Sequence, residues 1–437
     1  MSEKNNNQAP SGEKTMGAFT IIMLFGLAGL FLVVAGGIFY YAYLNPPAEK
    51  ETAESGAAAT PAETAEAETG GAEPAAGGET AGAEPAGPPP LAPLPPVSFP
   101  PDNPYSEAKV ELGRMLYFDP RFSGDGSLSC NSCHPASDGS WSVSSPISFG
   151  YPGSTHWRNA STIINTAYYS KLNWDGSKTS IEKQNKGAWG GAVAGNLDGG
   201  MAEERMAQIP EYVKRFNELF GDTWPTFEHA LMAVATFQRT IVSQNVPFDA
   251  YLEGDEDAIS DEAKAGYELF TGKAGCIACH NGPLVSDDSY HNTGVPNAPG
   301  FSNNALNQIT FRYEQWAKGV TEEDYNTATE DMGLYYVTKN ESDIGKFRTP
   351  SLRDACYTAP YMHNGVFSTL EEVVAFYNEG GGDHPNKDPL MQPLNLTADE
   401  QASLVAFLES LCGDKIIVEA PELPPYEVWD MEAVSNR

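Results

Sequence analysis

Two C-x-x-C-H motifs constrain this chain more than any other feature of its sequence. The motifs read Cys130-Asn-Ser-Cys133-His134 and Cys276-Ile-Ala-Cys279-His280. In such a motif the two thiols bond to the vinyl groups of one haem, and the histidine is the proximal ligand of the iron. The sequence therefore predicts two covalently bound haem c groups, with His134 on one iron and His280 on the other.

A zinc site and a thioredoxin-type redox pair are the alternatives for cysteines at this spacing. A zinc ribbon would place its two cysteine pairs much closer together along the chain than these motifs are. A redox pair needs no histidine after the second cysteine. We therefore favour haem at both motifs and expect one haem in each of two domains, 98–250 and 251–437.

Residues 17–44 form an apolar run without a single charged side chain. The run is longer than the roughly 20 residues that cross the hydrocarbon core of a bilayer. A cleaved signal peptide would have a shorter apolar region and a small-residue cleavage site. We therefore expect a retained single-pass transmembrane anchor over 17–44.

The charges around this run predict its orientation. Lys4 and Lys14 precede it and glutamates follow it, which by the positive-inside tendency makes residues 1–16 a cytoplasmic tail. Haem c is also attached outside the cytoplasm. The expected location is the cell inner membrane, with the haem domains on the periplasmic side.

Residues 45–97 are mainly Ala, Glu, Gly, Pro and Thr, almost without large apolar side chains before Leu91. Such a segment cannot bury enough apolar surface to offset its conformational entropy. We expect a disordered linker over 45–97, with a stiffer, polyproline-like end at 87–96.

The charge balance is strongly acidic. Asp and Glu number 59 against 26 Lys and Arg, which gives a formal net charge of −33 at pH 7. Nucleic acids are bound by clustered Lys and Arg, so the balance argues against a nucleic-acid partner and favours a basic protein partner.

Helix signals outnumber strand signals in the rest of the chain. Capping boxes at Thr397-Ala-Asp-Glu400 and Ser368-Thr-Leu-Glu371 predict two helix starts, the first before an inward-facing Leu404, Leu408 and Leu411. Clear alternating strand runs are scarce. The predicted fold class is mainly α.

Two cysteines, Cys356 and Cys412, lie outside the haem motifs. In an oxidising compartment we favour a disulfide between them over two separate buried thiols.

A series of further stretches accompanies the haem motifs. With them, the chain from Asn103 to about Pro425 resembles the bacterial di-haem cytochrome c peroxidases and their MauG-type relatives. The resemblance implies two all-α cytochrome c-like domains, with a peroxide-reactive haem in the first and an electron-transfer haem in the second. The stretches are Leu116-Tyr-Phe-Asp-Pro-Arg-Phe-Ser-Gly124, His156-Trp-Arg-Asn-Ala160, Asn173-Trp-Asp-Gly176, Ile209-Pro-Glu-Tyr212, Phe347-Arg-Thr-Pro-Ser-Leu-Arg353, Thr358-Ala-Pro-Tyr-Met-His-Asn-Gly365 and Leu404-Val-Ala-Phe-Leu408.

The resemblance implies roles for four residues outside the haem motifs. Trp174 matches a tryptophan that lies between the two haems and assists electron passage; a plain core aromatic is the alternative. Asn159, Thr358 and Pro360 match positions that bind one calcium ion between the domains, the last two through main-chain carbonyls. Ordinary turns remain the alternative for these three.

Two tyrosines stand where the peroxidases carry haem ligands. Tyr151 replaces the regulatory distal histidine, so the first haem is expected to be five-coordinate at rest; Tyr151 as a ligand, a proton donor or a plain loop residue stays open. Tyr377 replaces the methionine ligand of the second haem, and a tyrosinate favours oxidised iron. Met362 and Met391 are the rival ligands.

A missing acid counts against catalysis. Ala194 stands where the peroxidases carry the glutamate that moves the peroxide proton. Loss of a positioned proton-transfer group typically costs about 10²–10⁴-fold in rate. Asp198 in the same glycine-rich loop is the nearest replacement, alongside Tyr151 or a water chain.

The resemblance implies a peroxidase or MauG-like oxidant, and the apolar run makes it membrane-anchored. Its expected catalytic residues are Trp174, from the resemblance, and Tyr151 and Asp198, as replacements for missing family residues. Hydrogen peroxide is the expected oxidant, and a small soluble cytochrome c or another redox protein is the expected electron donor. The alternative is a non-catalytic di-haem electron carrier or redox sensor, which Ala194 and the missing histidine suggest.

Overall fold

The computed structural model of this chain describes residues 87–151 and 153–426. The predicted tail 1–16, the predicted anchor 17–44 and most of the predicted linker lie outside these residues. Within the described ranges, no helix combines the length and the apolar character needed to cross a bilayer.

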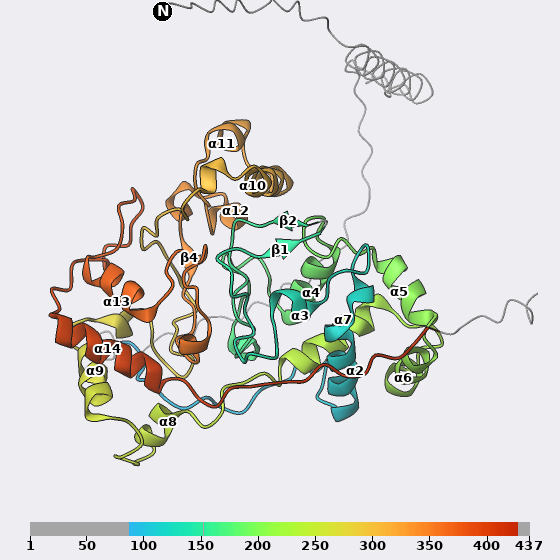
Figure 1. Cartoon of the computed structure of the whole chain (residues 1–437), viewed down its shortest axis with the longest axis horizontal. Helices are drawn as coiled ribbons and strands as arrows, with labels where there is room; N and C mark the ends of the chain where they lie inside the picture. Colours follow the sequence, from blue (N-terminus) through green and yellow to red (C-terminus); the bar gives the residue numbers. More distant parts are fainter. Residues whose placement is uncertain (1–86, 152, 427–437) are drawn as a thin grey trace, which may run out of the picture. The chain divides into compact units, whose positions relative to one another are not determined.

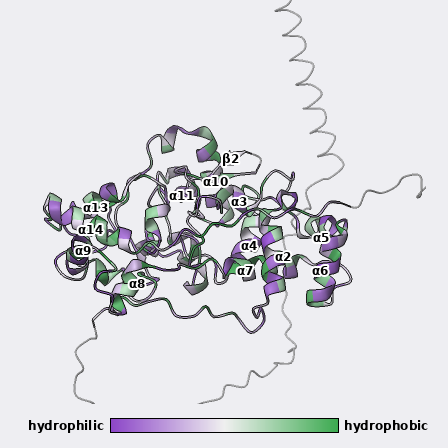
Figure 2. Cartoon of the chain, turned by 60° about the horizontal axis from the view of Figure 1, so that its bottom comes forward, coloured by the Kyte–Doolittle hydropathy of each residue, from purple (hydrophilic) through white to green (hydrophobic). Residues whose placement is uncertain are grey.

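Helices dominate the described residues, which confirms the mainly helical class, and each named strand is two residues long (Figure 1). Many of the helices carry hydrophilic residues on one side and hydrophobic residues on the other (Figure 2). The helices are α2 (Glu107–Phe118), α3 (Cys130–Cys133), α4 (Ile181–Gly190), α5 (Gly199–Ala207), α6 (Pro210–Phe220), α7 (Phe227–Gln238), α8 (Pro247–Leu252), α9 (Asp261–Thr271), α10 (Ala305–Ala317), α11 (Glu322–Thr327), α12 (Tyr335–Thr338), α13 (Leu370–Asn378) and α14 (Ala398–Ser410). The strands form two antiparallel pairs, β1 (Phe149–Gly150) with β2 (Ser154–Thr155) and β3 (Tyr290–His291) with β4 (Phe347–Arg348).

The first hydrophobic core lies where α2 packs on α7. Ser106 caps α2 by accepting a hydrogen bond from the main-chain N–H of Lys109, and Leu112 is fully buried. Gly113 allows the close approach of the two helices, because a Cβ there would lie 2.0 Å from the main-chain oxygen of Ala233.

The second core repeats this construction where α9 packs on α14. A Cβ on Gly266 would lie 1.9 Å from the main-chain oxygen of Ser403. The capping box of Thr397 and Glu400 that opens α14 is confirmed. The described residues thus contain two separate cores, and each is built on a helix pair that meets at a glycine. One haem motif adjoins each core. The domain boundary at 250 stays a prediction.

The predicted start of α13 was wrong by one residue. The capping box consists of Thr369 and Glu372 rather than Ser368 and Glu371. The Glu372 carboxylate accepts hydrogen bonds from the main-chain N–H groups of both Ser368 and Thr369. Both residues are therefore plausible N-caps when only the sequence is considered.

A disulfide joins Cys356 to Cys412, as predicted. It ties the segment before α13 to the end of α14, and so closes the second core covalently.

The two ends of the described chain each reach the opposite core. Leu91 belongs to the second core, and the main-chain oxygen of Ala92 accepts a hydrogen bond from Arg353 at 2.8 Å. At the other end, the main-chain oxygen of Ile416 accepts a hydrogen bond from the indole of Trp141 at 2.7 Å in the first core.

The expectation of disorder up to residue 97 is therefore wrong for the described part of that segment. Leu91 supplies the apolar anchor that the rest of the segment lacks, and proline carbonyls remain available as hydrogen-bond acceptors, as Pro95 shows toward Tyr168 at 2.7 Å.

Candidate active site

The first haem motif forms a single helical turn, α3, followed directly by His134. Cys130 and Cys133 lie three residues apart and therefore on one side of that turn. The Nδ1 atom of His134 lies 3.1 Å from the main-chain oxygen of Trp141. A proton shared there fixes the ring and leaves Nε2 for a metal.

The second motif repeats this arrangement on a 3₁₀ turn, Cys276–Ala278. The Nδ1 atom of His280 lies 3.3 Å from the main-chain oxygen of Val285. Trp141 and Val285 are both fully buried, and both have a positive φ, 51° and 52°. A non-glycine residue in this region costs energy and persists where the surroundings impose it, so both carbonyls are held rigidly toward their histidines.

Both haem motifs contain a buried thiol. Burial raises the pKa of Cys130 to about 12 and the pKa of Cys276 to about 12. A thioredoxin-type redox cysteine needs a stabilised thiolate, so this direction argues against a redox pair. The cysteine pairs also adjoin different cores, so they form no joint four-cysteine site.

The structure brings Tyr377 to the second motif. Its phenol is buried, which raises its pKa, and the neighbouring Cys276 and Cys279 raise it further. Tyr377 lies on helix α13, which follows the disulfide residue Cys356 in the sequence. Tyr377 as the second ligand of that haem, with Met362 and Met391 as rivals, stays a prediction.

The structure also brings Tyr151 and Ala194 to the first motif. The main-chain oxygen of Phe149 lies 3.4 Å from the sulfur of Cys133, so the β1–β2 hairpin covers this motif. Within the hairpin, the main-chain N–H of Tyr151 donates to the oxygen of Ala194 at 2.8 Å. The position of the missing acid and the position of the missing histidine are thus direct neighbours.

Asp198 is not part of this group. It is exposed, and its carboxylate caps α5 by accepting a hydrogen bond from the main-chain N–H of Met201 at 3.1 Å. The expectation that Asp198 replaces the missing acid conflicts with this capping role.

Trp174 is held by its main chain and its side chain. Its indole N–H donates to the main-chain oxygen of Asn159 at 2.9 Å. Its own main-chain oxygen accepts from the N–H of Arg348, on β4, at 2.9 Å. Trp174 therefore connects the segment after the first motif to a strand that follows the second.

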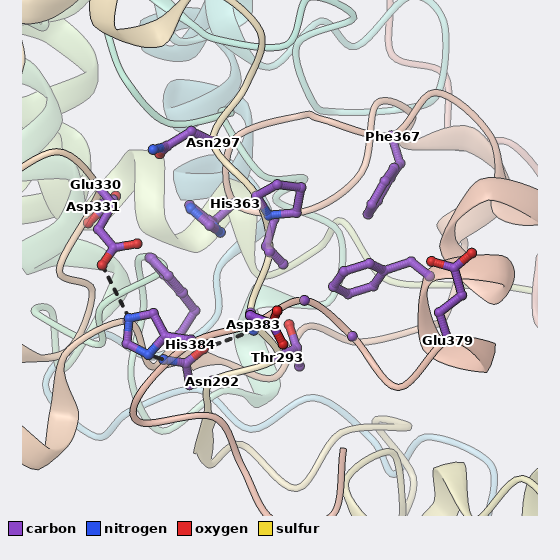
Figure 3. Close-up of a pocket in the computed structure, with 18 of the residues that line it drawn as sticks. Asn292, Thr293, Asn297, Glu330, Asp331, His363, Phe367, Glu379, Asp383 and His384 are labelled. Carbon is purple, nitrogen blue, oxygen red and sulfur yellow. Dashed lines mark hydrogen bonds and ion pairs between the residues drawn. The ribbon is translucent and has the colours of Figure 1, made fainter. Parts of the chain in front are cut away.

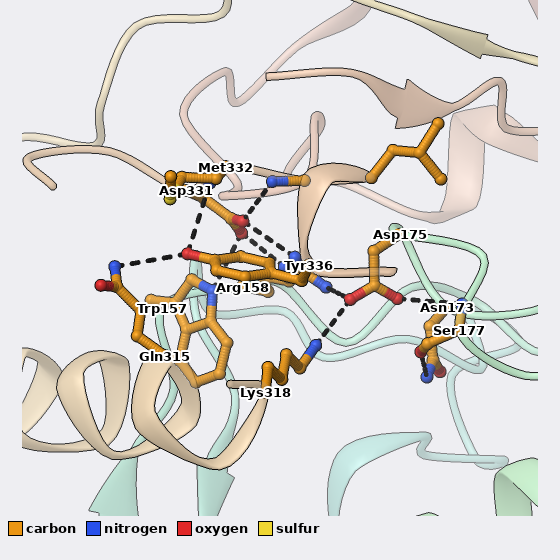
Figure 4. A network of polar contacts seen from close by, with 12 residues as sticks. Trp157, Arg158, Asn173, Asp175, Ser177, Gln315, Lys318, Asp331, Met332 and Tyr336 are labelled. Carbon is orange, nitrogen blue, oxygen red and sulfur yellow. Dashed lines mark hydrogen bonds and ion pairs between the residues drawn. The ribbon is translucent and has the colours of Figure 1, made fainter. Parts of the chain in front are cut away.

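A buried ionic network adjoins this tryptophan through Asp175, the next residue in the chain (Figure 4). The Arg158 guanidinium pairs with Asp175 at 2.9 Å and donates to Asp331 at 2.8 Å, and Lys318 reaches the same Asp175 carboxylate at 2.7 Å. Burial alone would raise the pKa of Asp331, but Arg158 outweighs this and lowers it. The network locks Asp175, the residue after Trp174, in place.

The predicted calcium residues come from two neighbouring segments. The main-chain N–H of Asn159 donates to the oxygen of His363 at 2.8 Å, three residues after Pro360. The Asn159 amide donates to Ser145 at 3.1 Å. This places Asn159 close to the stretch that holds Thr358 and Pro360, and a calcium ion there stays a prediction.

A pocket of about 600 Å³ opens between α13 and the segment that follows β3 (Figure 3). His363 lies in its wall and stacks on Phe347 with ring centroids 3.7 Å apart; burial lowers the pKa of His363 to about 4. His384 contacts Glu330 at 3.2 Å. None of the residues predicted to be catalytic lines this pocket.

Comparison with known proteins decides the family. The chain matches the di-haem cytochrome c peroxidase family over residues 107–257. It is 52% identical over 326 residues to the cytochrome-c peroxidase IdrP1 of Pseudomonas sp. (strain SCT), covering 74% of this chain and 86% of that protein. It is 36% identical over 323 residues to the methylamine utilization protein MauG of Methylorubrum extorquens, covering 74% and 83%. A crystal structure of a MauG-like protein associated with microbial copper homeostasis superposes with a TM-score of 0.63 at 31% identity, covering 75% of this chain and 95% of that one.

The chain belongs to the di-haem cytochrome c peroxidase and MauG family. It is accordingly a peroxidase-like oxidoreductase, and the family implies haem c at both C-x-x-C-H motifs. The residues fit that cofactor, because each motif presents two thiols and an oriented, uncharged imidazole from one turn. Burial lowers the pKa of His134, and it lowers the pKa of His280 to about 4, so both rings are neutral as ligands must be.

Sequence reasoning missed two histidines in this di-haem protein. His156 is half-buried, with Nε2 2.8 Å from the main-chain oxygen of Val193, beside Ala194. His291 lies close to Asp287 and Cys279. Among the described residues, these three are the one group of His, Cys, Asp or Glu side chains whose potential metal-ligand atoms all lie within 4.8 Å of one another. Because Cys279 belongs to the second haem motif, we read this group as the surroundings of that haem.

Proposed function

We propose that this chain reduces hydrogen peroxide with electrons from a small soluble c-type cytochrome or another redox protein. One peroxide, two electrons and two protons give two water molecules, so two one-electron donors are oxidised in each cycle. Bound haem supplies the iron centres that exchange these electrons. The observation that carries the proposal is the β1–β2 hairpin, which contacts Cys133 through Phe149 and Ala194 through Tyr151, beside an oriented His134.

The chain's own residues divide the remaining work. His134 and His280 would each ligate one haem iron, and Tyr377 would also hold the second haem. Trp174 is oriented between the two halves by Asn159 and Arg348. Tyr151, on the hairpin over Cys133, serves as the proton donor in place of the missing acid.

Peroxide turnover by the holoenzyme tests this proposal. Reduced basic cytochrome c is mixed with the full-length protein carrying both haems, and peroxide is then added in known amounts. We expect two cytochromes oxidised for each peroxide consumed. A rate no higher than that of free haem, without a change in the haem spectrum, would contradict the proposal.

A non-catalytic electron carrier or redox sensor is the second candidate. Ala194 favours it, because the loop beside Tyr151 offers no carboxylate and Asp198 caps α5. A protein that exchanges electrons with cytochrome c but leaves peroxide untouched would support this candidate.

We propose further that residues 17–44 anchor the chain in the inner membrane, with the haem domains on the periplasmic side. The uncharged length of this run and the lysines before it support the proposal. Protein that stays in the membrane fraction after an alkaline carbonate wash, and that is cleaved by protease added to the periplasm, would agree with it. Release by the wash would contradict it.

We also propose a calcium ion at Asn159, Thr358 and Pro360. Its support is the hydrogen bond that brings Asn159 to His363, next to the other two residues. Removing calcium with a chelator should change the haem spectrum and lower the turnover, and added calcium should restore both. A chelator without any effect would contradict the site.

A further inference from the structure

One face of α10 is apolar and open to solvent. Leu306, Ile309, Tyr313 and Trp316 follow one another at spacings of three, four and three residues, which aligns them along one side of the helix. The exposed fractions are 53% for Leu306, 65% for Ile309 and 71% for Trp316. A continuous exposed apolar face of this kind marks an interaction surface. We call these four residues the α10 stripe.

The other face of α10 is fixed to the fold. The Asn307 amide donates to the main-chain oxygen of His156, and the Thr310 hydroxyl donates to that of Thr155 on β2. Phe311 is fully buried and packs against Trp157. The stripe is therefore presented by a helix with a fixed orientation, above the hairpin that carries Tyr151.

A hollow of about 520 Å³ accompanies the stripe between α10 and α11. Tyr325 of α11 forms its far side, and Arg312 is the charged residue in its lining. The Arg312 guanidinium is already engaged, because it donates to the main-chain oxygens of Tyr325 and Ala328. The hollow is thus suited to an inserted apolar side chain.

The stripe ends close to the residues that hold Trp174. Lys318 follows Trp316 by two residues, and its ammonium group contacts the Asp175 carboxylate at 2.7 Å (Figure 4). Asp175 is the residue after Trp174. A protein docked on the stripe would therefore lie near Lys318, whose ion pair reaches the residue after the tryptophan to which we assign electron passage.

Around the stripe, the basic Arg312 and Lys318 are engaged by main-chain oxygens and by Asp175, and the other charges are acidic. Glu314 lies on α10, and Glu322 and Glu323 are exposed in the first turn of the adjoining α11. The whole chain has a formal charge of −33. An apolar centre with an acidic rim is complementary to a partner with an apolar patch and a basic rim.

We propose that the α10 stripe docks the electron donor, a small basic redox protein, in a weak and short-lived complex. This inference rests on the proposed function. Each docked donor gives up one electron, and two such encounters with two protons convert one hydrogen peroxide to two water molecules.

Variants of the full-length holoenzyme test the docking surface. Ile309→Asp and Trp316→Ala change the stripe, and Trp224→Ala is the matched control, because Trp224 is another exposed tryptophan, between α6 and α7. Peroxide-dependent oxidation is measured for reduced basic cytochrome c at low concentration and for a small dye donor. We expect the cytochrome-to-dye ratio to fall about tenfold in both stripe variants, and to stay at the wild-type value in the control.

Each outcome decides a specific point. An unchanged ratio in both stripe variants would overturn the docking inference. This holds even if the variants alter self-association in sedimentation or binding to lipid vesicles, because the stripe would then serve one of those contacts. A wild-type protein that oxidises neither donor would contradict the proposed function. A wild-type protein active with both donors, with variants that match it, would contradict the docking surface alone.

Discussion

The indole N–H of Trp174 donates a hydrogen bond to the main-chain oxygen of Asn159, with the two atoms 2.9 Å apart. The residues beside them are paired as well, because Arg158 precedes Asn159, Asp175 follows Trp174, and their charged groups lie 2.9 Å apart. This double connection gives the tryptophan one orientation. It also joins the first-motif segment to the region of β4, where Arg348 donates to Trp174.

Replacing Trp174 by phenylalanine removes the indole and its hydrogen bond while keeping an aromatic ring. We expect turnover with cytochrome c to fall about tenfold or more, which corresponds to about 1.4 kcal/mol or more of activation free energy. Stopped-flow oxidation of reduced cytochrome measures this, and Trp224→Phe is the control at an exposed site. Equal rates in both variants would remove Trp174 from the electron path.

Replacing Tyr377 by methionine should raise the reduction potential of one haem. The physical reason is that a neutral thioether stabilises reduced iron, whereas an anionic phenolate stabilises oxidised iron. A potentiometric titration followed by the haem spectrum measures both potentials. Tyr357→Phe, at a residue whose hydroxyl donates to Gly413, is the control. If neither potential moves in the methionine variant, Tyr377 is not the ligand.

Replacing Ala194 by glutamate returns a carboxyl group to the loop that is hydrogen-bonded to Tyr151. We expect the rate constant for the reaction with peroxide to rise by about 10²-fold or more, the usual effect of a positioned proton-transfer group. Ala194→Gln has the same size without an acid and serves as the control. A glutamine variant as fast as the glutamate variant would show that proton transfer is not the cause.

Asp331 links stability to pH. Arg158 lowers the pKa of Asp331 below its usual 3.8, so its ionised form stabilises the folded state above about pH 4, and this contribution is lost as the pH falls below that value. Asp331→Asn should remove this part of the acid dependence. At neutral pH it should lower the free energy of unfolding by about 3 kcal/mol, because the buried Arg158 loses a partner.

Unfolding of the variant holoenzyme by denaturant, repeated between pH 3 and pH 7, measures both effects. Glu330→Gln is the control, because this neighbouring carboxylate is about half exposed. An Asp331→Asn curve parallel to that of the wild type across the acid range would contradict the assigned role of the network.

The sequence predicted the parts of the site that depend on local spacing. The two C-x-x-C-H motifs and the capping box of Thr397 and Glu400 are short patterns, and each forms a turn or a helix start in the structure. The pairing of Cys356 with Cys412 followed from their being the two cysteines outside the motifs. The placement of Tyr377 beside the second motif followed from the family resemblance.

The parts that depend on long-range packing could not be predicted. Leu91 lies in a proline-rich stretch, and only the second core shows why it is buried. His156 carries no signal in its own neighbourhood, because its contacts are with Val193 and with Asn307 of α10. The cap that Asp198 forms on α5 was not predicted either, because a carboxylate in a glycine-rich loop looks the same whether it caps a helix or faces a ligand.

The most direct test of the proposed peroxidase function is the first turnover of the fully oxidised, full-length holoenzyme. The protein is mixed rapidly with hydrogen peroxide without prior reduction, reduced basic cytochrome c follows, and the haem spectrum and the cytochrome oxidation are recorded together. Because Tyr151 stands where a blocking histidine would be, we expect an immediate change in the haem spectrum and two cytochromes oxidised per peroxide. A spectrum that changes only after pre-reduction, or that never changes, would contradict it.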